Sequence, residues 1–201
     1  TLFRQKATRA RLNIAIMPDL SRRRVAGLLQ RVQGVLPELD LTLSDYGTPA
    51  DCRLTLDALR REDEIFLPLW EEDYVLCVPV GHPLAGRERL ALAELQHYDF
   101  IECPPCEAHQ QTIGLLACDR LTLNLVAKAE SKGLVMALVL AGVGISFLPD
   151  GLVEDEPGLR TVAVSGPRMF RRIGLCYPAH QTLNPALRDL IPELASRGAS
   201  W

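Results

Sequence analysis

Six cysteines are the most reactive side chains of this chain of 201 residues, and two of them stand close together. Residues 103–106 read Cys-Pro-Pro-Cys, followed by His109 and, further along, Cys118. The spacing fits a redox dithiol or half of a zinc site, although a second cysteine pair is missing for zinc and two prolines stiffen the loop. It also fits a ligand-contacting loop, with Cys106 near the amino end of a helix, where the pKa of a thiol falls. We expect neither a metal nor a cofactor.

The other cysteines indicate no catalytic centre. Cys77 and Cys176 fall in apolar stretches, where a thiol acts as a small hydrophobic side chain. This usage is typical of a reducing cytosol rather than of a disulfide framework. The sequence has no Ser-His-Asp order, phosphate-binding glycine loop or His-Glu-x-x-His motif, so we do not expect an enzyme.

Three predicted helix starts suit the binding of a small anion. Ser21 follows Pro-Asp-Leu, Ser131 follows Glu130, and the third start comes after the Cys-Pro-Pro-Cys sequence. Free backbone N–H groups and the helix dipole attract carboxylates at such positions. Both serines also fit as simple N-caps, and capping does not exclude contact with a ligand.

Alternating strands and helices must position these residues. Residues 12–17 form an apolar strand, Ser21 begins a helix that ends at Pro37, and residues 39–44 alternate as a second strand. Strand, helix and strand in this order favour a right-handed parallel unit.

Residues 131–149 join a helix end, a buried strand and a stop. Residues 131–140 read as an amphipathic helix, Gly142 suits the left-handed position that closes it, and residues 143–148 are an apolar run before Pro149. A helix that leads directly into a buried strand is typical of α/β proteins.

Two further stretches, combined with this one, resemble the effector-binding domain of LysR-type transcriptional regulators. Residues 68–79 read Pro-Leu-Trp-Glu-Glu-Asp-Tyr-Val-Leu-Cys-Val-Pro, and residues 81–85 read Gly-His-Pro-Leu-Ala. The resemblance covers about residues 11–194. It implies an α/β fold of two Rossmann-like lobes with a central cleft, like the type 2 periplasmic binding proteins.

The resemblance and the two predicted strand crossovers also give domain boundaries. Residues 1–10 are expected to end a linker from an N-terminal winged helix-turn-helix domain. Lobe I is predicted over residues 11–79 and 175–201, and lobe II over residues 80–174. The acidic residues 71–73 are expected to form a solvated rim.

Between Gly47 and Leu56 the chain is shorter than the family pattern by about one helical turn. Residues 56–59 are expected to form the next strand, with only residues 49–55 available for a helix before it. Either this regulator has lost that turn or residues are absent from the sequence.

The resemblance implies that a small, polar or anionic metabolite binds between the lobes and controls DNA binding by the N-terminal domain. It also implies a cytoplasmic homodimer or tetramer. The expected effector-binding residues are Ser21, Thr48, Pro105, Cys106, His109, Ser131 and Phe147. The expected dimer face on the first helix is Val25, Leu28, Leu29 and Val32.

Two alternatives stay open. A solute-binding protein of transport shares the two-lobe architecture. A subgroup of the regulators senses oxidants through a cysteine in the region of Cys106 and a second one further along, as Cys118 is here, although the spacing differs. The net charge of −3 argues against DNA binding by this chain itself, and no apolar run approaches the length of a membrane span.

Overall fold

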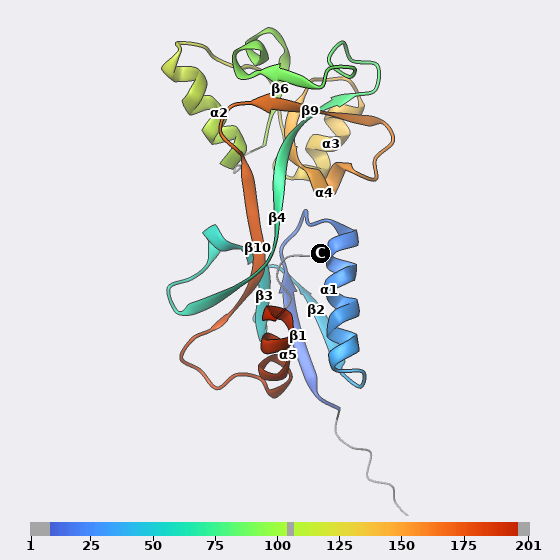
Figure 1. The fold of residues 1–201 in the computed structure, drawn as a ribbon, viewed down its shortest axis with the longest axis vertical. Coiled ribbons are helices and arrows are strands. Elements are labelled where there is room, and N and C mark those ends of the chain that lie inside the picture. The colour runs from blue at the N-terminus through green and yellow to red at the C-terminus, as the bar shows by residue number, and fades with distance from the viewer. Residues whose placement is uncertain (1–8, 104–106, 197–201) are drawn as a thin grey trace, which may run out of the picture. The chain divides into compact units, whose positions relative to one another are not determined.

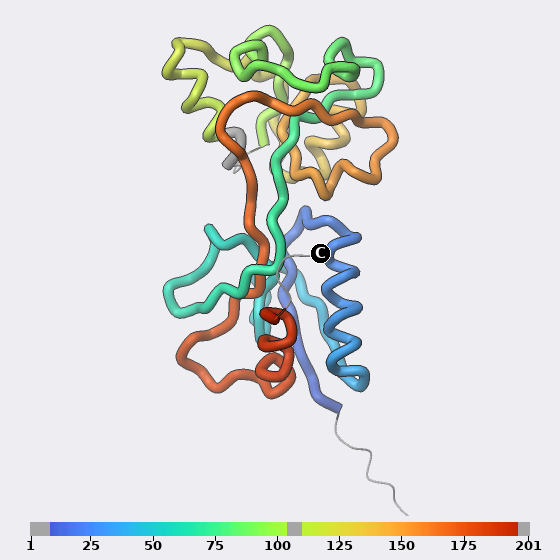
Figure 2. The backbone as a smooth tube through the Cα atoms, in the orientation of Figure 1, coloured from blue at the N-terminus to red at the C-terminus, as the bar shows by residue number. Residues whose placement is uncertain are grey.

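The structure, a computed structural model, describes residues 9–103 and 107–196 of a mixed α/β protein (Figure 1) (Figure 2). No helix in these ranges is long and apolar enough to cross a membrane. The strands are β1 (Arg11–Ile16), β2 (Asp40–Asp45), β3 (Cys52–Leu56), β4 (Glu64–Pro79), β5 (Arg89–Ala91), β6 (Asp99–Glu102), β7 (Asn124–Lys128), β8 (Ser146–Pro149), β9 (Leu159–Ser165) and β10 (Phe170–Pro178). The α-helices are α1 (Arg22–Val35), α2 (Glu107–Cys118), α3 (Lys132–Leu140), α4 (Asp150–Val153) and α5 (Pro185–Ala195), and the 3₁₀ helices are η1 (Asp57–Leu59) and η2 (Leu92–His97).

The chain divides into two compact units. The first takes residues up to Glu71 and from Arg172 onward, and the second is Glu72–Arg171. Both boundaries fall inside strands that contribute to both units, β4 and β10. The boundaries expected after residues 79 and 174 also fall on these two strands, and the assignment of lobes I and II stays a prediction.

Parallel pairing organises the first unit. β1 pairs in parallel with β2 on one side and with β3 on the other, and β10 pairs antiparallel with β3. Leu12 and Ile14, two residues apart on β1, point to the same face of the sheet. They meet Leu28 and Val32 of α1 and Leu187 of α5 in one core. Both helices therefore bury the same face of this sheet.

The third strand begins earlier than expected. β3 is Cys52–Leu56, and residues 57–59 form the 3₁₀ helix η1, so the expected strand over residues 56–59 is wrong. Residues 46–51, all of them described, connect β2 to β3 without a helix. All five residues of β3 are buried, including Arg53 and Thr55 on the face opposite the helices. The sequence pattern did not indicate β3 as a buried strand, because two of its five residues are polar.

Parallel strands also organise the second unit. β6 pairs in parallel with β7, and a parallel bridge joins Phe100 of β6 to Ile145 just before β8. β4 pairs antiparallel with both β8 and β9, and β9 pairs in parallel with β5. One core of this unit contains Phe100 and Phe147, and a second contains Val135 and Val139 of α3.

Two glycines shape the turn between α3 and β8. Gly142 has a φ of 76°, which confirms the left-handed helix end. At Gly144 an added Cβ would lie 2.7 Å from the carbonyl oxygen of Asp99, so only glycine fits against β6. The regular strand begins at Ser146, later than the expected residue 143. Ile145 before it makes only an isolated bridge to Phe100.

The acidic residues 71–73 are not a solvated rim. Glu72 is only 1% exposed, and its Oε2 accepts a hydrogen bond from Nε of Arg171 at 2.7 Å. The acidic residues on either side pair with exposed arginines. The partners of this run lie about a hundred positions away in sequence, beyond the reach of a local pattern.

Candidate functional site

In the first unit, two predicted ligand residues follow neighbouring parallel strands. Ser21 comes after β1 and Thr48 after β2. The register pairs Ile16 with Asp45, the last residues of the two strands, so both strands end at the same edge of the sheet. Ligands of α/β proteins commonly bind outside the carboxyl ends of such strands.

Ser21 caps α1. Its buried Oγ accepts a hydrogen bond from the backbone N–H of Arg24 at 3.3 Å. Asp19, two residues earlier, has a φ of 62°, a backbone conformation that Asp adopts more readily than most residues. Arg22 and Arg23 are exposed beside the cap. The arginines and the positive end of the helix dipole together favour an anion here. Asp19 belongs to the helix entry that the sequence indicates, whereas its left-handed backbone conformation was not predicted.

Thr48 lies in the loop of residues 46–51 between β2 and β3. It is exposed, and its backbone N–H donates a hydrogen bond to the carbonyl oxygen of Asp45 at 3.1 Å. A hydroxyl at this position can either donate to or accept from a ligand.

In the second unit, the predicted residues again follow parallel strands. The register pairs Glu102, at the end of β6, with Lys128, at the end of β7. Residues 104–106 follow β6, and Ser131 follows β7. Ser131 caps α3, since its Oγ accepts a hydrogen bond from the backbone N–H of Leu134 at 3.2 Å. In both units, therefore, a helix capped by a serine begins at the edge where parallel strands end.

Several predicted residues lie wholly or partly outside the described ones. Pro105 and Cys106 are not described, and His109 belongs to the first turn of α2 without a described side chain. Cys118 ends α2 as an exposed free thiol, and Cys103 is buried. Among the described residues, no group of three His, Cys, Asp or Glu side chains could hold a metal ion. The redox pair and the Cys-Pro-Pro-Cys loop stay predictions.

Phe147 lies inside the second unit. Its side chain is 2% exposed and packs against Phe100, with ring centroids 5.8 Å apart. The neighbouring Ser146 is buried too, and its Oγ donates a hydrogen bond to the carbonyl oxygen of Ile101 at 2.8 Å. In this unit Phe147 is a core residue, and its contact with a ligand stays a prediction.

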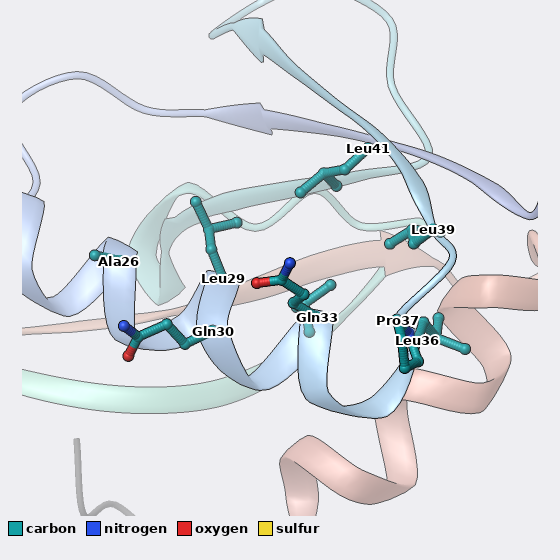
Figure 3. Close-up of a pocket in the computed structure, with 9 residues that line it drawn as sticks. Ala26, Leu29, Gln30, Gln33, Leu36, Pro37, Leu39 and Leu41 are labelled. Carbon is teal, nitrogen blue, oxygen red and sulfur yellow. The ribbon is translucent and has the colours of Figure 1, made fainter.

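A groove of about 410 Å³ runs between α1 and β2 in the first unit (Figure 3). Figure 3 shows Leu29 rising from α1 toward the strand that carries Leu41. Of the expected dimer face, Leu28 and Val32 are 1% and 2% exposed in the unit's own core. Leu29 instead lines the groove, together with other residues of α1, of β2 and of the connection between them: Ala26, Gln30, Val32, Gln33, Leu36, Pro37, Leu39 and Leu41.

Comparisons with known proteins agree with this architecture. The family model described as the LysR substrate binding domain matches residues 5–199. The uncharacterized HTH-type transcriptional regulator YybE of Bacillus subtilis is 31% identical over 132 residues, which are 65% of this chain and 45% of that protein. The probable hydrogen peroxide-inducible genes activator of Mycobacterium avium is 30% identical over 142 residues, 65% of this chain and 44% of that protein. The chain thus spans about half the length of these curated relatives.

Solved structures share the fold. The effector binding domain of QuiR in complex with shikimate has a TM-score of 0.76 at 18% identity, covering 94% of this chain and 96% of that one. The regulatory domain of CcmR from Synechocystis in complex with 2-PG has a TM-score of 0.76 at 16% identity, covering 92% and 96%. The oxidized form of OxyR has a TM-score of 0.72 at 20% identity, covering 94% and 95%.

Proposed function

Since the chain belongs to the LysR substrate-binding domain family, which consists of transcription regulators and not of enzymes, we propose that it senses a small-molecule effector. In the intact protein it would control DNA binding by an N-terminal winged helix-turn-helix domain in the cytoplasm. The name of the relative YybE, an HTH-type regulator, supports this role. Because the family consists of regulators, its match to this chain argues against a solute-binding protein of transport.

The proposed effector is a small polar or anionic metabolite. Its contacts would come from Ser21 and Thr48 in the first unit and from Ser131 in the second. The observation that carries this proposal is that each unit places a serine-capped helix at the carboxyl ends of parallel strands. The exposed Arg22 and Arg23 favour a negative charge, and similar effector domains have been solved with shikimate and with 2-PG.

A thermal-shift screen of small carboxylates and phosphorylated acids, with shikimate among them, tests the proposal, because a ligand that binds the native state raises the melting temperature. Calorimetry would then compare the wild type with Ser131→Ala and Thr48→Val. We expect each variant to bind the selected compound at least about tenfold more weakly, the effect of losing about 1.4 kcal/mol.

Thr42→Val, an exposed substitution within β2, is the matched control and should keep the wild-type affinity. Ser131→Ala also loses a cap worth about 1 kcal/mol of stability, so affinity and not melting temperature is the deciding measurement. Equal affinity in all four proteins would remove these residues from the site, and a screen without any binder would contradict the proposal.

We also propose that a second copy of the chain covers the groove between α1 and β2. β2 is an edge strand, and an apolar groove beside an unpaired edge favours association. The second unit offers an apolar counterpart on α3, where Leu134 is 60% and Leu140 is 42% exposed. If each copy offers its groove to α3 of the other, the pairing is isologous and closes as a dimer.

Light scattering at micromolar concentration tests this pairing. Leu29→Asp and Leu134→Asp should each shift the mass toward the monomer, because a charge would be buried in an apolar contact. Ile65→Asp is the control, since Ile65 is 42% exposed on β4, which three strands separate from β2 in the sheet, and should leave the mass unchanged. If the wild type is monomeric, or if both interface variants keep its mass, the pairing is wrong.

Oxidant sensing through Cys106 and Cys118 is the second candidate function. The exposed free thiol of Cys118 favours it, as does the hydrogen peroxide-inducible activator among the relatives. Treatment with hydrogen peroxide followed by peptide mass spectrometry would reveal a disulfide between the two cysteines. Its absence at concentrations that oxidise Cys118 would exclude this mechanism.

A further inference from the structure

The loop between β2 and β3 crosses β1 in only six residues, 46–51. Connections between parallel strands usually need a dozen residues or more and contain a helix. Here the register shortens the path, because Asp45 pairs with Ile16 and Cys52 pairs with Ile14, two positions back along β1. A loop without a helix lacks internal support, so its conformation depends on its contacts.

Asn13 of β1 holds the far end of this crossover loop. The backbone N–H of Asn13 donates to Oδ2 of Asp51 at 2.7 Å, and the N–H of Asp51 donates to the carbonyl oxygen of Asn13 at 3.0 Å. Nδ2 of Asn13 also donates to the carbonyl oxygen of Pro49 at 3.4 Å. Ser44 fixes the amide, since its Oγ donates to Oδ1 of Asn13 at 2.6 Å.

Tyr46 holds the near end. Its hydroxyl accepts a hydrogen bond from Nη1 of Arg53 at 2.8 Å and lies 2.9 Å from Oγ1 of Thr55. The Arg53 guanidinium also lies 5.6 Å from the centroid of the tyrosine ring, within the range of a cation–π contact. The loop therefore starts at a side chain fixed to β3 on the face opposite α1 and α5.

Arg53 is itself immobilised by a buried carboxylate. The Arg53 residue is 8% and Glu64 is 9% exposed. Nε of Arg53 donates to Oε1 of Glu64 at 2.9 Å, and Nη2 donates to Oε2 of Glu64 and to the carbonyl oxygen of Leu59. Oε2 of Glu64 also accepts from the backbone N–H of Arg61 at 3.0 Å. A bidentate pair of this kind fixes orientation as well as distance.

We propose that Tyr46, Arg53 and Glu64 are positioning residues that hold the crossover loop in the conformation in which Thr48 meets the effector. They replace the helix that the sequence pattern leads one to expect before β3. A loop ordered before binding loses less conformational entropy on binding, which raises affinity without any new contact. The role in binding rests on the proposed function, whereas the ordering of the loop does not.

Amide hydrogen exchange measured by NMR without ligand tests this inference. The reporters are the N–H groups of Thr48 and Asp51, which bond to the carbonyl oxygens of Asp45 and Asn13. Tyr46→Phe keeps the ring and removes only the hydroxyl. We expect both reporters to exchange about tenfold faster, equivalent to about 1.4 kcal/mol, with the amide of Leu36 at the end of α1 unchanged.

Tyr177→Phe is the matched control. It removes a tyrosine hydroxyl from β10 of the same unit. Among the described residues no hydrogen bond joins this hydroxyl to the loop, so the exchange of both reporters should stay at the wild-type rate. Unchanged exchange at Thr48 and Asp51 in Tyr46→Phe would overturn the inference. Equal acceleration at Leu36 would also overturn it, because the anchor would then stabilise the whole unit and not the loop. A metabolite screen without a binder would contradict the proposed function and leave this result standing.

Discussion

The thiols of Cys52 and Cys77 are shielded from chemistry by their surroundings. Burial raises the pKa of each to about 12, and the nearby Asp51 adds to the effect at Cys52. Only the thiolate is an effective nucleophile, so these side chains stay inert at neutral pH. Cys118 differs because it is exposed at the end of α2.

Alkylation checks this difference. Iodoacetamide at pH 7.5 should modify Cys118 in the native protein, with Cys52 and Cys77 reacting only after denaturation in urea. Peptide mass spectrometry quantifies each site separately. Rapid native labelling of Cys77 would show that the second unit opens far more often than its packing implies.

The buried pair of Glu72 and Arg171 is a second residue-scale feature with a measurable effect. Glu72→Gln should lower the free energy of unfolding by about 3–5 kcal/mol, because it leaves the Arg171 charge uncompensated in the interior. Asp73→Asn is the control: its ion pair with Arg168 is half exposed and should contribute about 0–1 kcal/mol. Urea denaturation measures the free energy of unfolding of both variants. If Glu72→Gln loses as little as Asp73→Asn, Glu72 is hydrated in solution.

At the scale of elements, β6 and the turn before β8 approach as closely as their backbones allow. Gly144→Ala would bring a methyl group against the Asp99 carbonyl and should destabilise by about 1–3 kcal/mol. Gly86→Ala is the control, because an added Cβ there meets no atom within 4 Å. Thermal unfolding compares the two variants. If Gly144→Ala is as stable as the wild type, the turn and β6 do not approach each other this closely in solution.

The buried pair of Arg53 on β3 and Glu64 on β4 should make stability depend on pH. Burial raises the pKa of Glu64, but the hydrogen bonds from Arg53 and from the Arg61 backbone outweigh it, so the pKa lies below its usual value. Such a group stabilises the fold above the unfolded pKa of about 4.3, and the stabilisation disappears as the pH falls through the folded pKa.

The wild type should therefore be much more stable than Glu64→Gln at pH 6, and this advantage should shrink steadily toward pH 3. Urea denaturation at pH 6, 4.5 and 3 measures the trend. The exposed Glu62→Gln serves as control and should track the wild type throughout. An advantage that is the same at all three pH values would show that the carboxylate charge is not what matters.

The elements differ in how far the sequence could predict them. α1 and the helix end at Gly142 were predictable because a cap, an apolar period and a glycine are local signals. β3 was not, since burial of Arg53 depends on Glu64, which approaches it only in the folded unit. Ser21 and Ser131 could be placed as caps, but the packing of Phe147 in a core comes from tertiary contacts.

At the scale of the whole molecule, each unit has its own interior. Among the described residues, the first unit is built around one core, and the second around two smaller ones. The second unit is a single stretch of chain, whereas the first is made of two stretches separated by it. In the first unit, β3 cannot pair with β10 until a residue as distant as Ile173 reaches Leu56.

This discontinuity determines the order in which the protein can fold as it is synthesised. Residues 72–171 leave the ribosome before Arg172 does, so the second unit is complete while the first still lacks its part of β10 and the whole of α5. Until then Leu12 and Ile14 have no α5 to pack against, and their apolar face is available to a chaperone. The unit that starts earlier within these residues is thus completed later, and its apolar face stays exposed while the second unit is synthesised.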